Sequence, residues 1–158
     1  MRSLLVLVGL AAICGAAPAF ASNCESISDS DARNHCRAVA KKDKGACESI
    51  RDSDRRNLCR AEASGNKSHC ESISDSNKRN QCRGVAGGKD SAGSCESISD
   101  SDQRNHCRAV ARKDKGPCES IRDSDARNYC RAVAGGNKSP CESIKDSNLR
   151  NRCRAEAR

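Results

Sequence analysis

The chain contains the stretch CESISDSDARNHCRAVA at residues 24–40, and five further copies of this unit follow it. Each copy has a second cysteine twelve positions after its first, and the copies start 23 residues apart, or 25 between the third and the fourth. The first cysteines are Cys24, Cys47, Cys70, Cys95, Cys118 and Cys141. An internal repeat of this length is typical of arrays in which neighbouring units bury a shared core.

The six copies form two larger units. Copies one to three match copies four to six at an offset of 71 residues. We therefore divide this part of the chain into a first repeat triplet at residues 22–86 and a second at residues 95–158. A connector rich in glycine and serine, residues 87–94, joins them.

Residues 1–21 have the pattern of a secretory signal peptide. Arg2 precedes an apolar stretch at residues 4–13, and Ala-Phe-Ala at residues 19–21 is a small-x-small cleavage site. Cys14 raises the alternative of a lipid anchor, but the bulky isoleucine before it does not suit a lipobox. We expect cleavage after Ala21, a secreted or periplasmic protein, and no transmembrane segment in the mature chain, because no later apolar stretch is long enough.

The composition after the signal peptide explains why covalent links are needed. Charged residues make up 32% of the chain, tryptophan is absent, and Tyr129 is the only aromatic residue beyond residue 21. Such a chain buries too little apolar surface to offset its conformational entropy. Twelve cysteines remain in an exported chain, the setting in which disulfides form and persist.

The spacing of the cysteines limits how they can pair. Positions twelve apart on one continuous helix would lie about 18 Å apart, whereas disulfide Cα atoms lie within about 7 Å. Either each copy folds back and closes on itself, or the second cysteine of one copy pairs with the first of the next, as in Cys36 with Cys47. We favour closure within each copy, and each closed loop should stabilise the fold by about 3 kcal/mol. The expected pairs are Cys24–Cys36, Cys47–Cys59, Cys70–Cys82, Cys95–Cys107, Cys118–Cys130 and Cys141–Cys153.

Each copy reads as two short helices. The first is expected to begin with a capping box, clearest at residues 139–142 (Ser-Pro-Cys-Glu), and to end soon after the position of Ile27. Asp and Ser at residues 29–31 then break the chain and cap a second helix that runs to about Lys42. The sequence therefore predicts an all-α array of six disulfide-stapled helical hairpins, either stacked as a solenoid or strung as beads.

The sequence offers no candidate catalytic residues and no metal set built from cysteine and histidine. His35 and His106 occupy a position that holds other residues in the remaining copies, and His69 lies in a connector. We interpret all three histidines as surface residues. No Cys-x-x-Cys motif is present for zinc or redox chemistry. We therefore expect no enzyme activity, no cofactor and no resident metal.

Calcium is an alternative ligand. Glu25, Asp29 and Asp31 place oxygen atoms in one short segment of every copy, although Asp31 becomes Asn77 and Asn148 in two of them. An EF-hand loop also needs a central glycine and a terminal bidentate glutamate. Helix capping explains the same residues without a metal.

Two arginines, fixed in all copies, are the candidate binding face. Arg33 and Arg37 are four residues apart, on one helical face, and their repetition predicts a basic stripe for anionic groups. The alternative is that they pair with Glu25 and Asp29 of the same or a neighbouring copy. The full set is Arg33, Arg37, Arg56, Arg60, Arg79, Arg83, Arg104, Arg108, Arg127, Arg131, Arg150 and Arg154.

These observations favour a non-catalytic secreted or periplasmic protein with a structural or binding role. The formal net charge of +8 suits an anionic surface, a polysaccharide or a protein as partner. Nucleic acid is disfavoured because no aromatic platform accompanies the charge. A multivalent cationic toxin, antimicrobial or inhibitor scaffold, and ion sequestration, are the alternatives.

Overall fold

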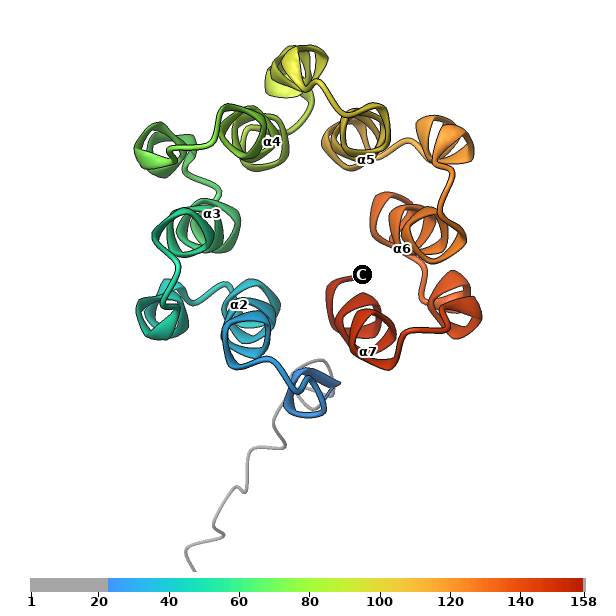
Figure 1. The fold of residues 1–158 in the computed structure, drawn as a ribbon, viewed down its shortest axis with the longest axis horizontal. Helices are drawn as coiled ribbons and strands as arrows, with labels where there is room; N and C mark the ends of the chain where they lie inside the picture. Colours follow the sequence, from blue (N-terminus) through green and yellow to red (C-terminus); the bar gives the residue numbers. More distant parts are fainter. Residues whose placement is uncertain (1–22, 158) are drawn as a thin grey trace, which may run out of the picture.

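The computed structural model describes residues 23–157, which form six helical repeats arranged as a closed ring (Figure 1). Each repeat consists of a short outer turn with the first cysteine, followed by an inner α-helix with the second. The described residues contain helices and turns and no β-strand. The all-α array of disulfide-stapled repeats is therefore confirmed, and it is a packed solenoid rather than a string of beads. The expected signal peptide at residues 1–21, with Cys14, lies outside the described residues.

The α-helices line the inside of the ring and the 3-10 helices the outside (Figure 1). The inner helices are α2 (Ser30–Lys41), α3 (Ser53–Ser64), α4 (Ser76–Ala86), α5 (Ser101–Arg112), α6 (Ser124–Gly135) and α7 (Ser147–Glu156). The outer helices are η1 (Lys44–Ser49), η2 (Lys67–Ser72), η3 (Gly88–Ser97), η4 (Gly116–Ser120) and η5 (Ser139–Ser143). Most of the connector between the triplets is part of η3.

Every inner helix begins at an aspartate, as the Asp-Ser break predicts. The side chain of Asp29 accepts a hydrogen bond of 2.7 Å from the backbone N–H of Ala32, and the other five repeats have the same cap at 2.6–2.8 Å. This bond satisfies one of the amide groups that have no partner in the first helical turn. The helix α2 ends where Lys42 adopts a left-handed conformation with φ 53°.

The predicted capping box of the outer helices is wrong. In η5 the cap position is Lys138, without a side-chain cap bond, and Ser139 is already inside the helix. Glu142 pairs instead with Arg154, because a guanidinium is a stronger partner for a carboxylate than a backbone amide. In η1 the cap is Asp43, which accepts from the N–H of Gly45.

Six disulfides close the repeats on themselves. Each joins the two cysteines of one repeat across a Cα–Cα distance of 5.6–5.7 Å, so pairing between neighbouring repeats does not occur. All twelve cysteines are fully buried. Each disulfide therefore lies at the centre of its repeat.

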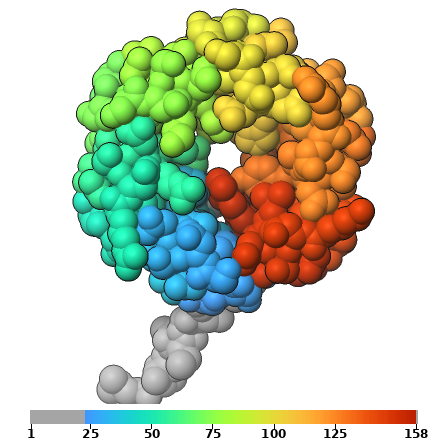
Figure 2. Space-filling view, viewed as in Figure 1, coloured from blue at the N-terminus to red at the C-terminus, as the bar shows by residue number. Residues whose placement is uncertain are grey.

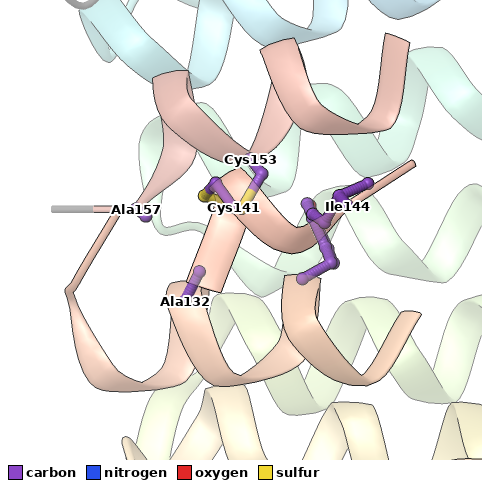
Figure 3. Packing of buried hydrophobic residues seen from close by; sticks show 6 residues of the cluster. Ala132, Cys141, Ile144, Cys153 and Ala157 are labelled. Atoms are coloured by element: carbon purple, nitrogen blue, oxygen red, sulfur yellow. A yellow bond between two sulfur atoms is a disulfide. The ribbon is translucent and has the colours of Figure 1, made fainter. Parts of the chain in front are cut away.

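The repeats pack through one small apolar cluster at each junction. Figure 3 shows this cluster where repeat five meets repeat six: Ala132 of α6 lies against the Cys141–Cys153 disulfide, Ile144 and Ala157. At the first junction, Ala38 packs in the same way against the next disulfide and Ile50. A small residue is needed at this place, since it lets one helix approach the sulfur atoms of the next repeat.

A hydrogen bond accompanies each cluster. The eighth residue of every repeat, an aspartate or asparagine, accepts a bond of 2.9–3.3 Å from the backbone N–H of the fifth residue of the following repeat. Asp54, for example, accepts from Ser74 at 2.9 Å. Only a side-chain oxygen is needed, which explains why Asn77 and Asn148 replace aspartate.

The same two contacts join repeat six to repeat one and close the ring. Ala155 of α7 packs on Cys24, Ile27 and Cys36. Asn148 accepts a hydrogen bond of 3.1 Å from the backbone N–H of Ser28, 120 positions away in the sequence. Because each repeat packs on the next in the same way, the helices α2 to α7 point the same way along the axis of the ring, and Figure 1 shows them end-on.

Gly84 replaces the junction alanine where the spacing lengthens to 25 residues. A Cβ atom there would lie 2.5 Å from Sγ of Cys95 and 2.6 Å from Sγ of Cys107. Ala92, from the longer connector, supplies apolar contact with this disulfide instead. The two extra residues thus change the local packing but keep the ring closed.

We expect Gly84→Ala to destabilise the fold, because overpacking a core typically costs about 1–3 kcal/mol, more than alanine gains within a helix. The matched control is Gly135→Ala in α6, where the added Cβ meets only the flexible Lys115 side chain, so stability should stay the same or rise. Chemical denaturation of both variants measures the difference. Equal stability changes would contradict the packing described for Gly84.

We expect Ala155→Arg to open the ring, since the charged side chain cannot be buried against the Cys24–Cys36 disulfide. Hydrogen exchange should rise at residues 23–36 and 147–157, the radius of gyration should increase, and repeats three and four should stay protected. Ser143→Arg, at an exposed position of η5, is the control. Unchanged protection of residues 23–36 in Ala155→Arg would show that this contact does not hold the ring closed.

Candidate functional site: the lumen of the ring

Two of the variable positions of the repeat, the twelfth and the sixteenth, face the lumen. The floor position precedes the second cysteine, and the wall position lies four residues later, one helical turn away on the same face. The floor residues are His35, Leu58, Gln81, His106, Tyr129 and Arg152. The wall residues are Val39, Glu62, Val85, Val110, Val133 and Glu156. Figure 2 shows the lumen as an opening in the space-filling surface.

The larger cavity of the lumen has a volume of about 740 Å³. It is lined by every wall residue and by every floor residue except His35. Lys42, Gly65 and Lys113, which follow the C-terminal ends of α2, α3 and α5, also line it and mark its mouth. Its volume lies within the range of about 300–1,000 Å³ that is usual for small-molecule sites.

A smaller cavity of about 330 Å³ lies toward the opposite end of the ring. Asp29, Asp31 and Arg55, at the N-terminal ends of α2 and α3, line it together with His35. Arg152 and Leu58 line both cavities, and so they lie between them. The lumen thus has two chemically different mouths.

A polar network crosses the seam of the ring. Nε2 of His35 lies 3.1 Å from Oε2 of Glu62, and its Nδ1 lies 4.0 Å from Oε1 of Glu156. His35, in the first repeat, therefore lies between carboxylates from the second and sixth repeats. It is only 7% exposed.

The network continues around the other side of the lumen. Glu156 accepts a hydrogen bond of 2.9 Å from Nε of Arg152 and another from the hydroxyl of Tyr129. The Arg152 guanidinium lies 5.5 Å from the centre of the Tyr129 ring, which stacks on His106 at 5.5 Å. Within residues 23–157, the buried Nε2 of His106 has no hydrogen-bond partner.

This environment shifts the ionisation of the lumen residues. Burial, with a smaller contribution from Arg152, lowers the pKa of His106 to about 4. Burial alone would raise the pKa of the Glu156 carboxyl, but Arg152, His35 and the Tyr129 hydroxyl together lower it. Burial also raises the pKa of Tyr129. At neutral pH the lumen therefore holds a neutral His106 and a charged Glu156.

The prediction that the histidines are surface residues is wrong for His35 and His106. The two side chains lie in the lumen, and His69, in η2, is half-buried. Variation among the copies is typical of exposure to solvent, but in a ring it also marks the inner surface. The signal in the sequence is that the twelfth and sixteenth positions both vary and lie four residues apart on one helical face.

The twelve fixed arginines serve the fold within their own repeats. Arg37 pairs with Glu25, and the equivalent ion pairs of all six repeats have Nε–Oε1 distances of 2.7–2.9 Å. Arg33 and its equivalents do not pair with Asp29; each donates to the backbone carbonyl of the isoleucine in its own repeat, as Arg56 does to Ile50 at 2.6 Å. Internal pairing, the alternative to a binding face, thus accounts for the Arg37 positions.

The acids considered for calcium have three separate roles. Glu25 holds Arg37, Asp29 caps α2, and Asp31 accepts from the backbone N–H of Arg51 in the next repeat. Within residues 23–157, no group of three or more histidine, cysteine or acidic side chains is arranged to hold a metal ion.

The fold and the lumen define a class: a disulfide-stapled, all-α repeat ring with one variable inner surface. Comparison of the chain with known protein families, with curated proteins and with solved structures found no match. No helix in the described part of the chain is long and apolar enough to cross a membrane. The six disulfides fit a secreted protein or an oxidising compartment.

We expect His106 to make folding sensitive to acid. Its folded pKa of about 4 lies below the unfolded value of about 6.5. The contribution of neutral His106 to the free energy of unfolding is therefore fully present above pH 6.5 and is lost as the pH falls toward 4. The linked free energy is at most about 3 kcal/mol. His106→Gln should flatten the dependence of unfolding free energy on pH in this window, and His69→Gln should not. An imidazole of His106 that titrates near pH 6.5 by NMR would contradict the burial.

Proposed function

We propose that this protein is an exported, non-catalytic binding protein that holds a small molecule in the lumen of its ring. The observation that carries this proposal is that the fixed and the cavity-lining positions of the repeat have different roles. The fixed residues form disulfides, caps, ion pairs and junctions, whereas two of the variable positions, the floor and the wall, line one cavity. A purely structural ring would not need twelve inner side chains of such different chemistry.

The chemistry of the cavity supports binding. Four valines form the apolar part of the cavity wall. A few polar groups, among them Gln81, His106 and Arg152, lie on its floor. An apolar cavity with few convergent polar groups is typical of small-molecule sites.

The repeated arginines support this role indirectly. Each Arg37 equivalent holds the outer turn of its repeat against the inner helix, and the disulfide fixes the same two elements. The floor and wall side chains are thus mounted on rigid helices, and a pre-organised site loses less free energy to ordering when it binds.

The single tyrosine gives a direct test. Tyr129 lies in the lumen, and the chain has no tryptophan, so tyrosine fluorescence reports on the cavity. We expect compounds from a panel of carboxylates, amines, sugars and nucleosides to change this emission and to stabilise the protein, by about 2.7 kcal/mol at a hundredfold excess over Kd.

The control is the double variant Val85→Phe/Val133→Phe, which fills the cavity from two helices, α4 and α6. It should fold and should lose both responses. A panel without any response in the wild-type protein, or responses that persist in the filled variant, would contradict binding in the lumen.

A further inference from the structure

We propose that the ligand of the lumen is a small organic anion, a carboxylate joined to an apolar body, which enters between Lys42 and Lys113 and is held by Arg152. This inference rests on the proposed function and adds the class of ligand. Three features of the larger cavity carry it: the charge of its mouth, the free donors on its floor and its apolar wall.

The mouth of the larger cavity is basic. Lys42 and Lys113 occupy equivalent positions three repeats apart, so they lie on opposite sides of the ring, and both are exposed cavity residues. Both adopt the left-handed conformation, with φ 53° and 54°, which turns the chain sharply at the ends of α2 and α5. The geometry places two positive charges across the entrance.

The two connectors that carry these lysines strengthen the field. Residues 41–44 contain three lysines and one aspartate, and residues 112–115 contain three basic residues and one aspartate. The C-terminal ends of the helices contribute partial negative charges at this mouth, but these connectors bring full positive charges to it. Anions are therefore attracted to this end, whereas Asp29 and Asp31 line the other end together with the cation Arg55.

The floor offers a guanidinium with unused donors. The Nε of Arg152 donates its hydrogen bond to Glu156. In the described part of the chain, its Nη1 and Nη2 donate no hydrogen bond to a protein acceptor. Its side chain is 36% exposed. A guanidinium binds a carboxylate through two parallel hydrogen bonds, so the two Nη groups suit one carboxylate.

The cavity lining has two acids, Glu156 and Glu62. Glu156 is bonded to Arg152 and Tyr129, and Glu62 lies 3.1 Å from Nε2 of His35, away from the mouth. A cation would meet Lys42 and Lys113 first, whereas an anion would meet them and then Arg152.

The wall determines the rest of the ligand. Val39, Val85, Val110 and Val133 line the cavity between the mouth and the floor. Burial of apolar surface on these side chains stabilises a bound hydrocarbon group by about 25 cal/mol per Å². A fully polar anion such as citrate would lose its hydration without this gain.

The test compares octanoate, octylammonium and octanol, which share a chain length and differ in charge, by titration of Tyr129 fluorescence in the full mature protein. We expect octanoate to bind most tightly and inorganic phosphate not to bind. Tighter binding of octylammonium, or equal binding of octanol, would contradict the proposal that the ligand is an anion.

Arg152→Gln should weaken octanoate binding about tenfold or more, the usual effect of losing a charged hydrogen bond, and Lys145→Gln, at an exposed position of the same repeat, should not. Because Arg152→Gln leaves Glu156 without its partner, Arg152→Gln/Glu156→Gln is measured as well. If both Arg152 variants fold and bind octanoate as the wild type does, the proposal is wrong.

Lys42→Asn/Lys113→Asn keeps the left-handed turns, which asparagine tolerates, and should make octanoate binding weaker and less dependent on salt. Lys44→Asn/Lys115→Asn, in the same connectors but outside the cavity lining, is the control. Equal effects of the two pairs would refute entry between Lys42 and Lys113. If none of the octyl compounds binds but other panel compounds respond and lose their response in Val85→Phe/Val133→Phe, the class of ligand is wrong and the lumen site stands.

Discussion

The disulfide between positions one and thirteen of each repeat is the constraint on which the rest of the structure depends. It folds the outer turn back against the inner helix within a unit that has one isoleucine and a few alanines to bury. Its sulfur atoms then form the surface on which the alanine of the preceding repeat packs. One bond thus stabilises the repeat and creates the junction, so a chain with 32% charged residues can still build a continuous core.

Ring closure follows from repeating one kind of junction six times. Every junction contributes a similar rotation, and after six repeats the last alanine, Ala155, meets the first disulfide. A closed ring has no terminal repeat with an exposed apolar face, which open solenoids must cover with special capping units. The junction at Gly84 shows that this geometry is kept even where the connector is two residues longer.

Closure also separates the residues of the repeat by role. The positions that form the disulfides, the Arg–Glu ion pairs and the apolar junctions are held to one chemistry, and they repeat almost unchanged. The inner positions face a shared cavity in which each copy contributes one part of a single site. Six copies of one sequence thereby produce an asymmetric lumen, with His35 between two carboxylates on one side and Tyr129 stacked on His106 on the other.

The sequence by itself determined the repeat, its helical class and the break at Asp29, because caps, cysteine spacing and periodicity act over a few residues. The paired helices needed no long-range information. The spacing of twelve residues excluded one continuous helix and favoured closure within each repeat, and the structure decided against pairing between neighbouring repeats. The ring, the buried histidines and the network through Glu156 were decided only by the tertiary structure. They depend on the small rotation from one repeat to the next, which no local pattern encodes. That rotation accumulates over six junctions until residues 120 positions apart, Ser28 and Asn148, form a hydrogen bond.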